Sequence, residues 1–151
     1  MIHGLSAIGA TGASLNNTFT LALLAEIYLR HDRIDEGLGA IEEAEKLVVT
    51  WGELFWQAEL LRLKGELLLG QSDQSVHAGE QCLCEALKTA QDQHATMLEL
   101  RAATSLAKLW RKLNKLDEAK RILNSVCVKF NERADNLDLN EAKTVLARLR
   151  V

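Results

Sequence analysis

The stretch GELLLGQSDQSVHAGEQCLCEA, residues 65–86, decides the fold. Gly65 is followed three residues later by Leu68, and a second small residue, Gly79, lies in the second half of the stretch. The leucines keep the three- and four-residue spacing of an amphipathic helix, which Gly70-Gln71-Ser72-Asp73 interrupts. We therefore expect two helices joined by a loop at residues 70–73, with the glycines allowing the two axes to approach closely.

The same pattern recurs before and after this stretch. Small residues in the first half of the unit fall at positions 25, 65 and 107, and those in the second half at 37, 79 and 119, so the period is 40–42 residues. Three residues after each small residue of the first half comes an aromatic residue or a leucine, which would fill the space beside the helix crossing. A period of this size indicates a solenoid of helix pairs. The repeat signature consists of Ala25, Tyr28, Gly37, Gly65, Leu68, Gly79, Ala107, Trp110 and Ala119.

The composition indicates an all-α fold. The chain has no proline and only 5% aromatic residues, so it is poor in the residues that best form turns and strands. The apolar spacing predicts about three antiparallel helix hairpins and a C-terminal helix in one domain, residues 17–151. Residues 1–16, rich in glycine and small polar residues, are either a weak N-terminal cap or the remnant of a preceding helix. The expected repeats and the terminal helix cover residues 17–51, 53–93, 95–133 and 138–151.

Local signals predict several helix ends. Asp32 and Asn114 lie where an N-cap would begin the second helix of a hairpin. Gly52 is placed to end the helix before it. Asp138, followed three residues later by Glu141, is typical of a capping box at the start of the last helix.

Charge and cysteine content argue against several kinds of partner. The net charge of −3 predicts no attraction to nucleic acid or to an anionic membrane surface. The apolar runs are far shorter than a membrane span, and the first residues lack the pattern of a signal peptide. Three cysteines are an odd number in a chain without disulfide-rich character, which favours reduced thiols and a cytoplasmic location.

No motif predicts catalysis, a metal site or a cofactor. Gly4 and Gly9 have the spacing of a phosphate loop, but the Lys-Ser/Thr pair required after the second glycine is missing. Cys82 and Cys84 are too close in sequence for a zinc knuckle, and on a helix their thiols point to different faces. The four histidines are scattered, and no Ser-His-Asp arrangement is visible. We therefore expect a protein that is not an enzyme and holds no cofactor.

Three aromatic residues gather near the expected turn before the second hairpin. Trp51, Phe55 and Trp56 lie within six residues of one another. Packing between neighbouring hairpins is the first interpretation. The alternative is an exposed aromatic patch used for self-association or for docking a partner.

The repeats resemble the tetratricopeptide repeat, whose helix pairs use small residues at the crossings and an aromatic residue beside them. This resemblance implies a short right-handed superhelix. The period exceeds the roughly 34 residues typical of that family, which implies longer helices. The proline that often closes a unit is missing here.

A closer likeness covers about residues 9–150. Segments such as AELLRLKGELLL, residues 58–69, and ELRAATSLA, residues 99–107, are similar to the C-terminal tetratricopeptide region of large bacterial signalling ATPases. These proteins are often described as adenylate-cyclase-like or as predicted ATPases. In that family the region looks like a sensor or interaction arm behind a nucleotide-binding module. The likeness therefore implies the regulatory arm of a larger bacterial protein, without its catalytic parts.

The resemblance also implies where a partner binds, because the first helix of each tetratricopeptide pair lines the concave face. In this register one end of that face is acidic and apolar, and the other end is basic. Arginine pairs with carboxylates in a bidentate fork, so the basic row of Arg62, Arg101, Lys108 and Arg111 would hold an acidic peptide. Charge pairing between neighbours on a solvated helix face is the alternative for any single residue. The candidate partner-binding residues are Phe19, Glu26, Leu29, Glu59, Arg62, Glu66, Arg101, Lys108 and Arg111.

The sequence thus predicts a non-enzymatic module that binds a protein or peptide partner by surface complementarity. The alternative is a helical-repeat domain that senses a small ligand, with a pocket near Trp110 or Trp56. Apolar surface at the ends of the solenoid would also allow two copies of the chain to associate.

Overall fold

The computed structural model describes residues 17–52, 54–130 and 136–149, and all regular structure in these ranges is helical. The expectation of an all-α fold is therefore confirmed, whereas the expectations for residues 1–16 lie outside the described residues. Two short 3-10 turns, η2 (Leu54–Trp56) and η3 (Asp73–Ser75), precede α4 and α5. The α-helices in the described ranges are α2 (Asn17–Arg30), α3 (Ile34–Trp51), α4 (Gln57–Gln71), α5 (Val76–Asp92), α6 (Thr96–Lys112), α7 (Leu116–Cys127) and α8 (Leu137–Arg148).

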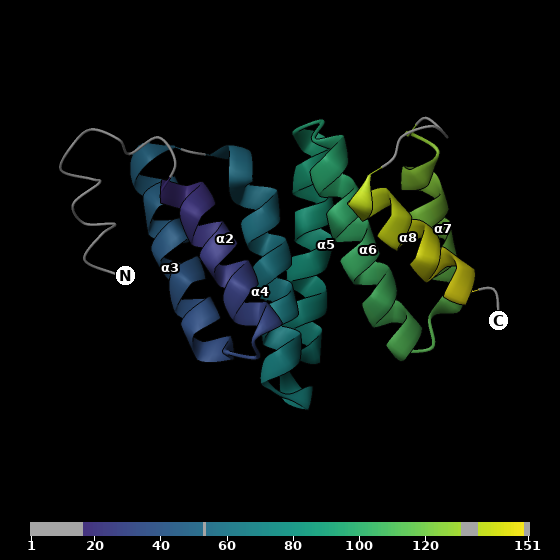
Figure 1. Ribbon diagram of the computed structural model, residues 1–151, viewed down its shortest axis with the longest axis horizontal. Coiled ribbons are helices and arrows are strands. Elements are labelled where there is room, and N and C mark those ends of the chain that lie inside the picture. Colours follow the sequence, from purple (N-terminus) through teal and green to yellow (C-terminus); the bar gives the residue numbers. More distant parts are fainter. Residues whose placement is uncertain (1–16, 53, 131–135, 150–151) are drawn as a thin grey trace.

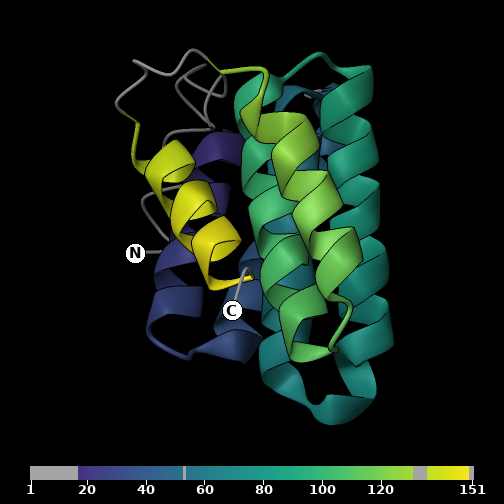
Figure 2. The same cartoon turned by 90° about the vertical axis from the view of Figure 1, so that its right-hand side faces the viewer.

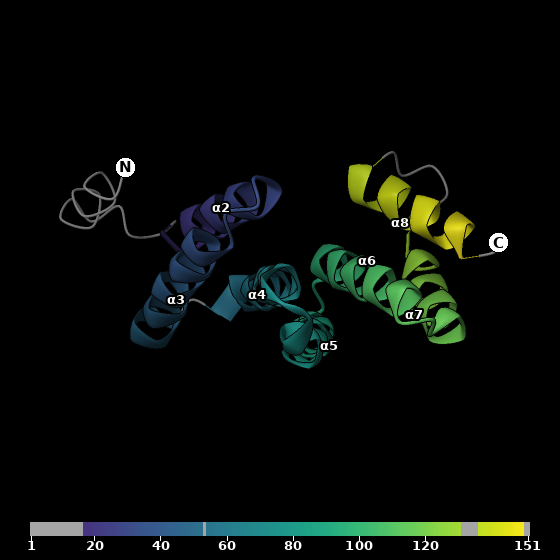
Figure 3. The same ribbon diagram turned by 90° about the horizontal axis from the view of Figure 1, so that it is seen from below.

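The helices stand side by side in a row and run in alternating directions (Figure 1). Helix α2 packs on α3, α4 on α5 and α6 on α7, while α3 also contacts α4 and α5 also contacts α6. Seen from below, α2 and α8 lie on one side of the row, and α4 and α6 lie between them (Figure 3). The end-on view agrees, with α8 in yellow and α2 in purple on the same side (Figure 2). We call α2, α4, α6 and α8 the inner helices and α3, α5 and α7 the outer helices.

Apolar side chains of successive hairpins form the core. One cluster joins α2, α3 and α4, and it contains Leu21, Ile41, Leu63 and Leu67. Leu83 of α5 packs in a cluster with Leu106 and Leu109 of α6. A further cluster joins α6, α7 and α8. Because each cluster draws on helices of different hairpins, burial of apolar surface links the hairpins in a row. The main members of that third cluster are Leu100, Ala103, Ala107, Ala119, Leu123, Val126, Leu139, Ala142, Val145 and Leu149.

Glycines set the closest helix approach. Gly65 of α4 and Gly79 of α5 lie opposite each other, and a Cβ atom added to either would stand 3.0 Å from the carbonyl oxygen of the other. A Cβ at Gly37 would meet the side chain of Leu67 at 2.5 Å, so this glycine makes room for α4 of the next hairpin. The remaining small residues of the repeat signature, Ala25, Ala107 and Ala119, are fully buried.

Three turns share one backbone design. Asp32, His94 and Asn114 adopt the left-handed conformation, with φ of 57°, 53° and 60°. The residue after each donates its N–H to a carbonyl five residues earlier, at 2.8–2.9 Å, which is the long hydrogen bond of a Schellman motif. The predictions that Asp32 and Asn114 cap the following helices are therefore wrong, and Arg33 and Lys115 hold the N-cap positions. Short Asp and Asn side chains suit the left-handed conformation, so these residues end the helix before them.

At the other helix ends, the predictions from the sequence are confirmed only in part. Gly52 ends α3 with φ of 68°, as predicted. The capping box at the last helix is wrong, because the Asn136 side chain accepts the N–H groups of Asp138 and Leu139 at 2.8 and 3.3 Å. The loop predicted at residues 70–73 is shorter, since α4 continues to Gln71.

Two predicted boundaries shift by several residues. The second repeat is predicted to begin at residue 53, but its first helix, α4, begins at Gln57, after the 3-10 turn η2. The third repeat is predicted to reach residue 133, but its second helix, α7, ends at Cys127, and residues 131–135 lie outside the described ranges. In the part of the chain that the structure describes, every helix is too short or too polar to cross a bilayer.

A carboxylate links the second and third hairpins. Glu80 of α5 accepts hydrogen bonds from Trp110 Nε1 of α6 and from Lys115 Nζ, both at 2.7 Å. The hydrogen bond from Lys115 lowers the pKa of Glu80. Partial burial opposes this shift, the Trp110 hydrogen bond adds to it, and the pKa lies below its ordinary value of 4.5. Trp110 thus fills space beside the helix crossing and also orients a charged group.

Gly65→Leu should lower the free energy of unfolding by about 1–3 kcal/mol, because the crossing of α4 and α5 has no room for a side chain. Gly39→Leu is the matched control. Gly39 is exposed within α3, and nothing lies within 4 Å of an added Cβ. The control should match the parent chain or exceed it by up to about 1 kcal/mol. Urea unfolding followed by circular dichroism measures both, and equal stability of the two variants would contradict the close crossing.

Glu80→Gln should lower the melting temperature near neutral pH, and the difference from the parent should shrink as the pH falls through the lowered pKa of Glu80. A carboxyl whose pKa is lowered by folding adds stability above its unfolded pKa and loses it as the pH falls. Differential scanning calorimetry from pH 7 to pH 3 measures this convergence. Glu43→Gln, at an exposed position of α3, is the control. A difference between parent and Glu80→Gln that stays constant over this range would show that the charge of Glu80 adds no stability.

Candidate functional site

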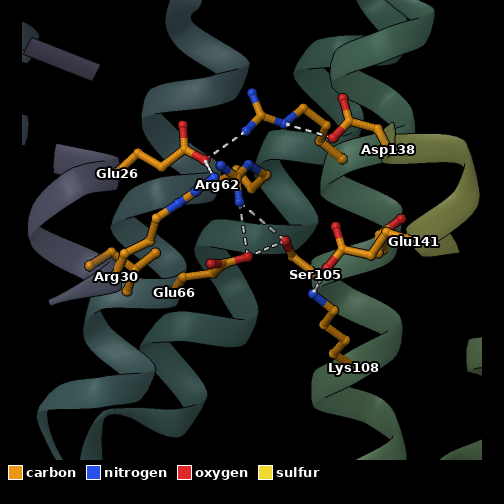
Figure 4. Close-up of a pocket in the computed structure, with 11 residues that line it drawn as sticks. Glu26, Arg30, Arg62, Glu66, Ser105, Lys108, Asp138 and Glu141 are labelled. Carbon is orange, nitrogen blue, oxygen red and sulfur yellow. Dashed lines mark hydrogen bonds and ion pairs between the residues drawn. The ribbon is translucent and has the colours of Figure 1, made fainter. Parts of the chain in front are cut away.

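The inner helices enclose a hollow of about 370 Å³, which we call the polar section (Figure 4). Side chains from opposite walls point toward one another across it, with Arg62 near the centre (Figure 4). Residues of α4 and α6 form its floor, and residues of α2 and α8 form its walls. Seen from below, α4 and α6 lie between α2 and α8 (Figure 3). Its lining consists of Glu26, Leu29, Arg30, Arg62, Glu66, Arg101, Thr104, Ser105, Lys108, Asp138 and Glu141.

Arg62 is buried on the floor of the polar section and bound on two sides. Its Nε and one terminal nitrogen donate to the two oxygens of Glu59 at 2.9 and 2.7 Å, and both side chains are more than nine-tenths buried. Its other terminal nitrogen donates to Glu66 at 2.9 Å, and Ser105 of α6 also donates to Glu66. Burial lowers the pKa of Arg62, but the bonds and charges of Glu59 and Glu66 raise it further than burial lowers it. Arg62 therefore stays charged.

Arg101 joins three inner helices. Its terminal nitrogens lie 2.7 Å from Glu59 Oε1 and 3.3 Å from Glu26 Oε1, and its Nε lies 3.8 Å from Asp138 Oδ1. These carboxylates belong to α4, α2 and α8 respectively. One guanidinium on the floor thus connects both walls of the polar section.

The walls carry further ion pairs. Arg30 donates to Glu26 at 2.9 Å within α2, and Lys108 of α6 donates to Glu141 of α8. Partial burial raises the pKa of Glu26, but the Arg30 hydrogen bond and the charges of Arg101 and Arg62 lower it by more, so its pKa lies below the ordinary value. Every cation that lines the polar section is therefore already paired with a carboxylate of this chain.

The hollow continues into a second part of about 510 Å³, which we call the apolar section. Leu29, Glu66, Ser105 and Lys108 line both parts, so the two form one groove. Asp73 and Lys112 stand at its exposed side. The side chains that make it apolar are Leu29, Leu69, Val76, Leu109 and Leu113.

The structure brings together most of the residues proposed from the sequence as a partner-binding face. Seven of the nine belong to the groove or its floor, with Glu59 beneath the guanidinium groups. Phe19 does not line the groove, and its ring packs at a tilt against Trp56 with centroids 4.8 Å apart. Arg111 lines neither section. The acidic end and the basic end expected from the sequence meet in ion pairs.

In the polar section, sequence reasoning missed Arg30, Ser105, Asp138 and Glu141. Arg30 is four residues after Glu26, a spacing that places two side chains on one helix face, so this pair was detectable. Asp138 and Glu141 were assigned to a capping box, although they project from α8 toward Arg101 and Lys108. No local pattern shows that α8 returns to the inner side of the row.

Of the three aromatic residues near the second hairpin, one packs between hairpins and two are exposed. Trp56 is half-buried and packs against Ala58, Ala90 and Leu98, which joins α4, α5 and α6. Trp51 and Phe55 are exposed, with Phe55 edge-on to Trp56. Neither Trp56 nor Trp110 lines either section of the groove.

An apolar hollow of about 540 Å³ lies between α2 and α3, at the end of the row opposite α8. Leu23 and Ile27 line it and are 43% and 52% exposed. The residues one period later, Leu63 and Leu67, are 0% exposed because they pack in the cluster of α2, α3 and α4. The repeat thus provides apolar side chains at these positions in both hairpins, but covers them only in the second.

The cysteines and the other residues considered as metal or phosphate sites form no site in the part of the chain that the structure describes. Cys84 is exposed, Cys82 and Cys127 are half-buried, and burial raises the pKa of all three thiols. The described residues contain no group of three or more His, Cys, Asp or Glu side chains arranged to hold a metal ion. Gly4 and Gly9 lie outside the described ranges.

Arg62→Met should lower the free energy of unfolding by about 3–5 kcal/mol, because it leaves the buried Glu59 carboxylate with fewer partners. Arg33→Met is the control, since Arg33 also pairs with a glutamate three residues away in sequence, Glu36, but both side chains are exposed. The control should lower the free energy of unfolding by at most about 1 kcal/mol, because its ion pair is exposed and its guanidinium lies over the Tyr28 ring at 4.6 Å. Urea unfolding measures both variants. If Arg62→Met is as stable as Arg33→Met, the cluster does not hold the inner helices together.

Comparison with other proteins adds no further assignment. No protein-family model, curated protein or solved structure matches this chain. The groove and the sequence resemblance are therefore the grounds for a functional proposal.

Proposed function

We propose that this chain is a helical-repeat binding module that takes a segment of a protein partner along the groove between its inner helices. The main support is that four helices from different hairpins line one continuous groove. A hollow lined by both charged and apolar side chains offers buried contact area for affinity and oriented polar groups for selectivity. We place no catalytic step in this groove.

The proposal includes a tetratricopeptide-like arrangement, in which the hairpins form a short right-handed superhelix. The buried small residues at the helix crossings and the alternation of inner and outer helices support it. The sequence likeness to the C-terminal regions of bacterial signalling ATPases further supports a role as the regulatory arm of a larger protein.

A small-ligand sensor is the second candidate. The two sections, of about 370 and 510 Å³, have the size of small-molecule sites. Zwitterionic metabolites, which carry both a positive and a negative charge, would suit the ion pairs of the polar section. A melting-temperature screen of such compounds distinguishes the candidates, because a sensor should be stabilised by one compound far more than by peptides.

Mapping a bound peptide tests the groove directly. Peptides selected from a random 12-residue library displayed on phage would be titrated into the full ¹⁵N-labelled chain, followed by amide correlation spectra. Amides of the inner helices around Leu29, Ser105 and Leu113 should shift, and those around Val49 on the outer helix α3 should not. Shifts confined to the outer helices would contradict the proposal, as would a library that yields no binding peptide.

A further inference from the structure

Resting on the proposed function, we infer that the groove prefers a peptide segment with a basic side chain at one end and apolar side chains at the other, rather than the acidic peptide that its arginines first suggest. The basic side chain would enter the polar section and pair with the carboxylates of α8. The apolar side chains would fill the apolar section. Two independent features of the groove support this partner chemistry.

The first feature is that the guanidinium groups on the floor of the groove are already paired with carboxylates. Arg62 is held by Glu59 and Glu66, and Arg101 by Glu59 and Glu26, so both guanidinium groups on the floor point at carboxylates of this chain. A carboxylate from a partner would have to displace one of these glutamates, and the displaced carboxylate would then lie unpaired beside the ligand. Breaking a buried ion pair is costly, so an acidic ligand gains little from these arginines.

The second feature is the surplus of acceptors. With Glu59 included, the described part of the polar section and its floor holds five carboxylates and four cations. A carboxylate has two oxygens with about four acceptor sites, more than one ion pair uses. Asp138 has the weakest contact, an ion pair of 3.8 Å, and its side chain is 34% exposed. Glu141 is 53% exposed. An added ammonium or guanidinium can therefore pair with α8 without displacing a group already bound.

The order of side chains along α6 sets the spacing within the partner. Arg101 lies in the polar section and Leu113 in the apolar section, with Ser105 and Lys108 shared between them. At 1.5 Å per residue, the twelve steps from Arg101 to Leu113 span roughly 18 Å. An extended peptide covers this length with about five or six residues. The basic and apolar side chains should therefore occur within one short segment.

The peptide selection described above also tests this composition. Enriched peptides should combine Lys or Arg with Leu, Ile, Met or Phe within about six residues. Fluorescence polarisation with one synthetic peptide should then show binding at least about tenfold weaker for the double variant Asp138→Asn/Glu141→Gln, and likewise for Leu113→Ser. Glu42→Gln and Val49→Ser, at exposed positions of α3, are matched controls and should bind like the parent. Circular dichroism checks that all variants fold.

A charge reversal provides a gain of function. Selection on the Glu141→Lys chain should shift the enriched peptides from basic toward acidic residues. If the parent chain instead enriches acidic peptides that shift groove amides, the inference is wrong while the proposed groove stands. If peptides bind equally to the parent and to all groove variants, and shift only outer-helix amides, both the inference and the proposed function are wrong.

Discussion

The buried pairing of Arg62 with Glu59 and Glu66 is the interaction on which the groove depends. It places a permanent charge on the floor between α4 and α6, and Ser105 and Arg101 extend it to α6, α2 and α8. A charge at this depth is tolerated only when its partners are in place, so the inner helices must keep their relative positions for the cluster to be satisfied. The apolar core could accept small sliding of the hairpins more easily than this network can.

Glycine at the crossing of α4 and α5 lets these two helices approach closely, which is the second feature that fixes their relative positions. The two helices of the second hairpin approach until Gly65 and Gly79 face each other, which no larger residue would permit. This feature could be predicted from the sequence, because small residues recur with a fixed period and their steric role is local. The same holds for the all-α fold and for Gly52, whose left-handed conformation ends α3. Period, composition and local backbone preference determine these features without knowledge of distant contacts.

The charge arrangement could not be predicted in the same way. Glu26 and Arg101 are 75 residues apart in sequence and meet only because α2 and α6 both face the groove. In the sequence, a row of basic residues therefore predicts a free basic surface. In the structure, each member that lines the groove is paired with a carboxylate of this chain. Turn residues were misassigned for a related reason. Asp32 and Asn114 suit both a helix start and a left-handed helix end, and in the structure both adopt the second.

Function follows from what these pairs leave available. With its cations paired, the groove offers carboxylate oxygens at α8 and apolar side chains beyond Lys108, and in the function we propose this combination would give it selectivity. The most direct measurement is a crystal structure of the chain with one selected peptide. We predict a lysine or arginine of the peptide against Asp138 or Glu141 and an apolar side chain among Leu69, Leu109 and Leu113, with the Arg62 cluster unchanged. A peptide carboxylate bound to Arg101 or Lys108 in place of Glu26 or Glu141, or a peptide lying on the outer helices, would contradict this prediction.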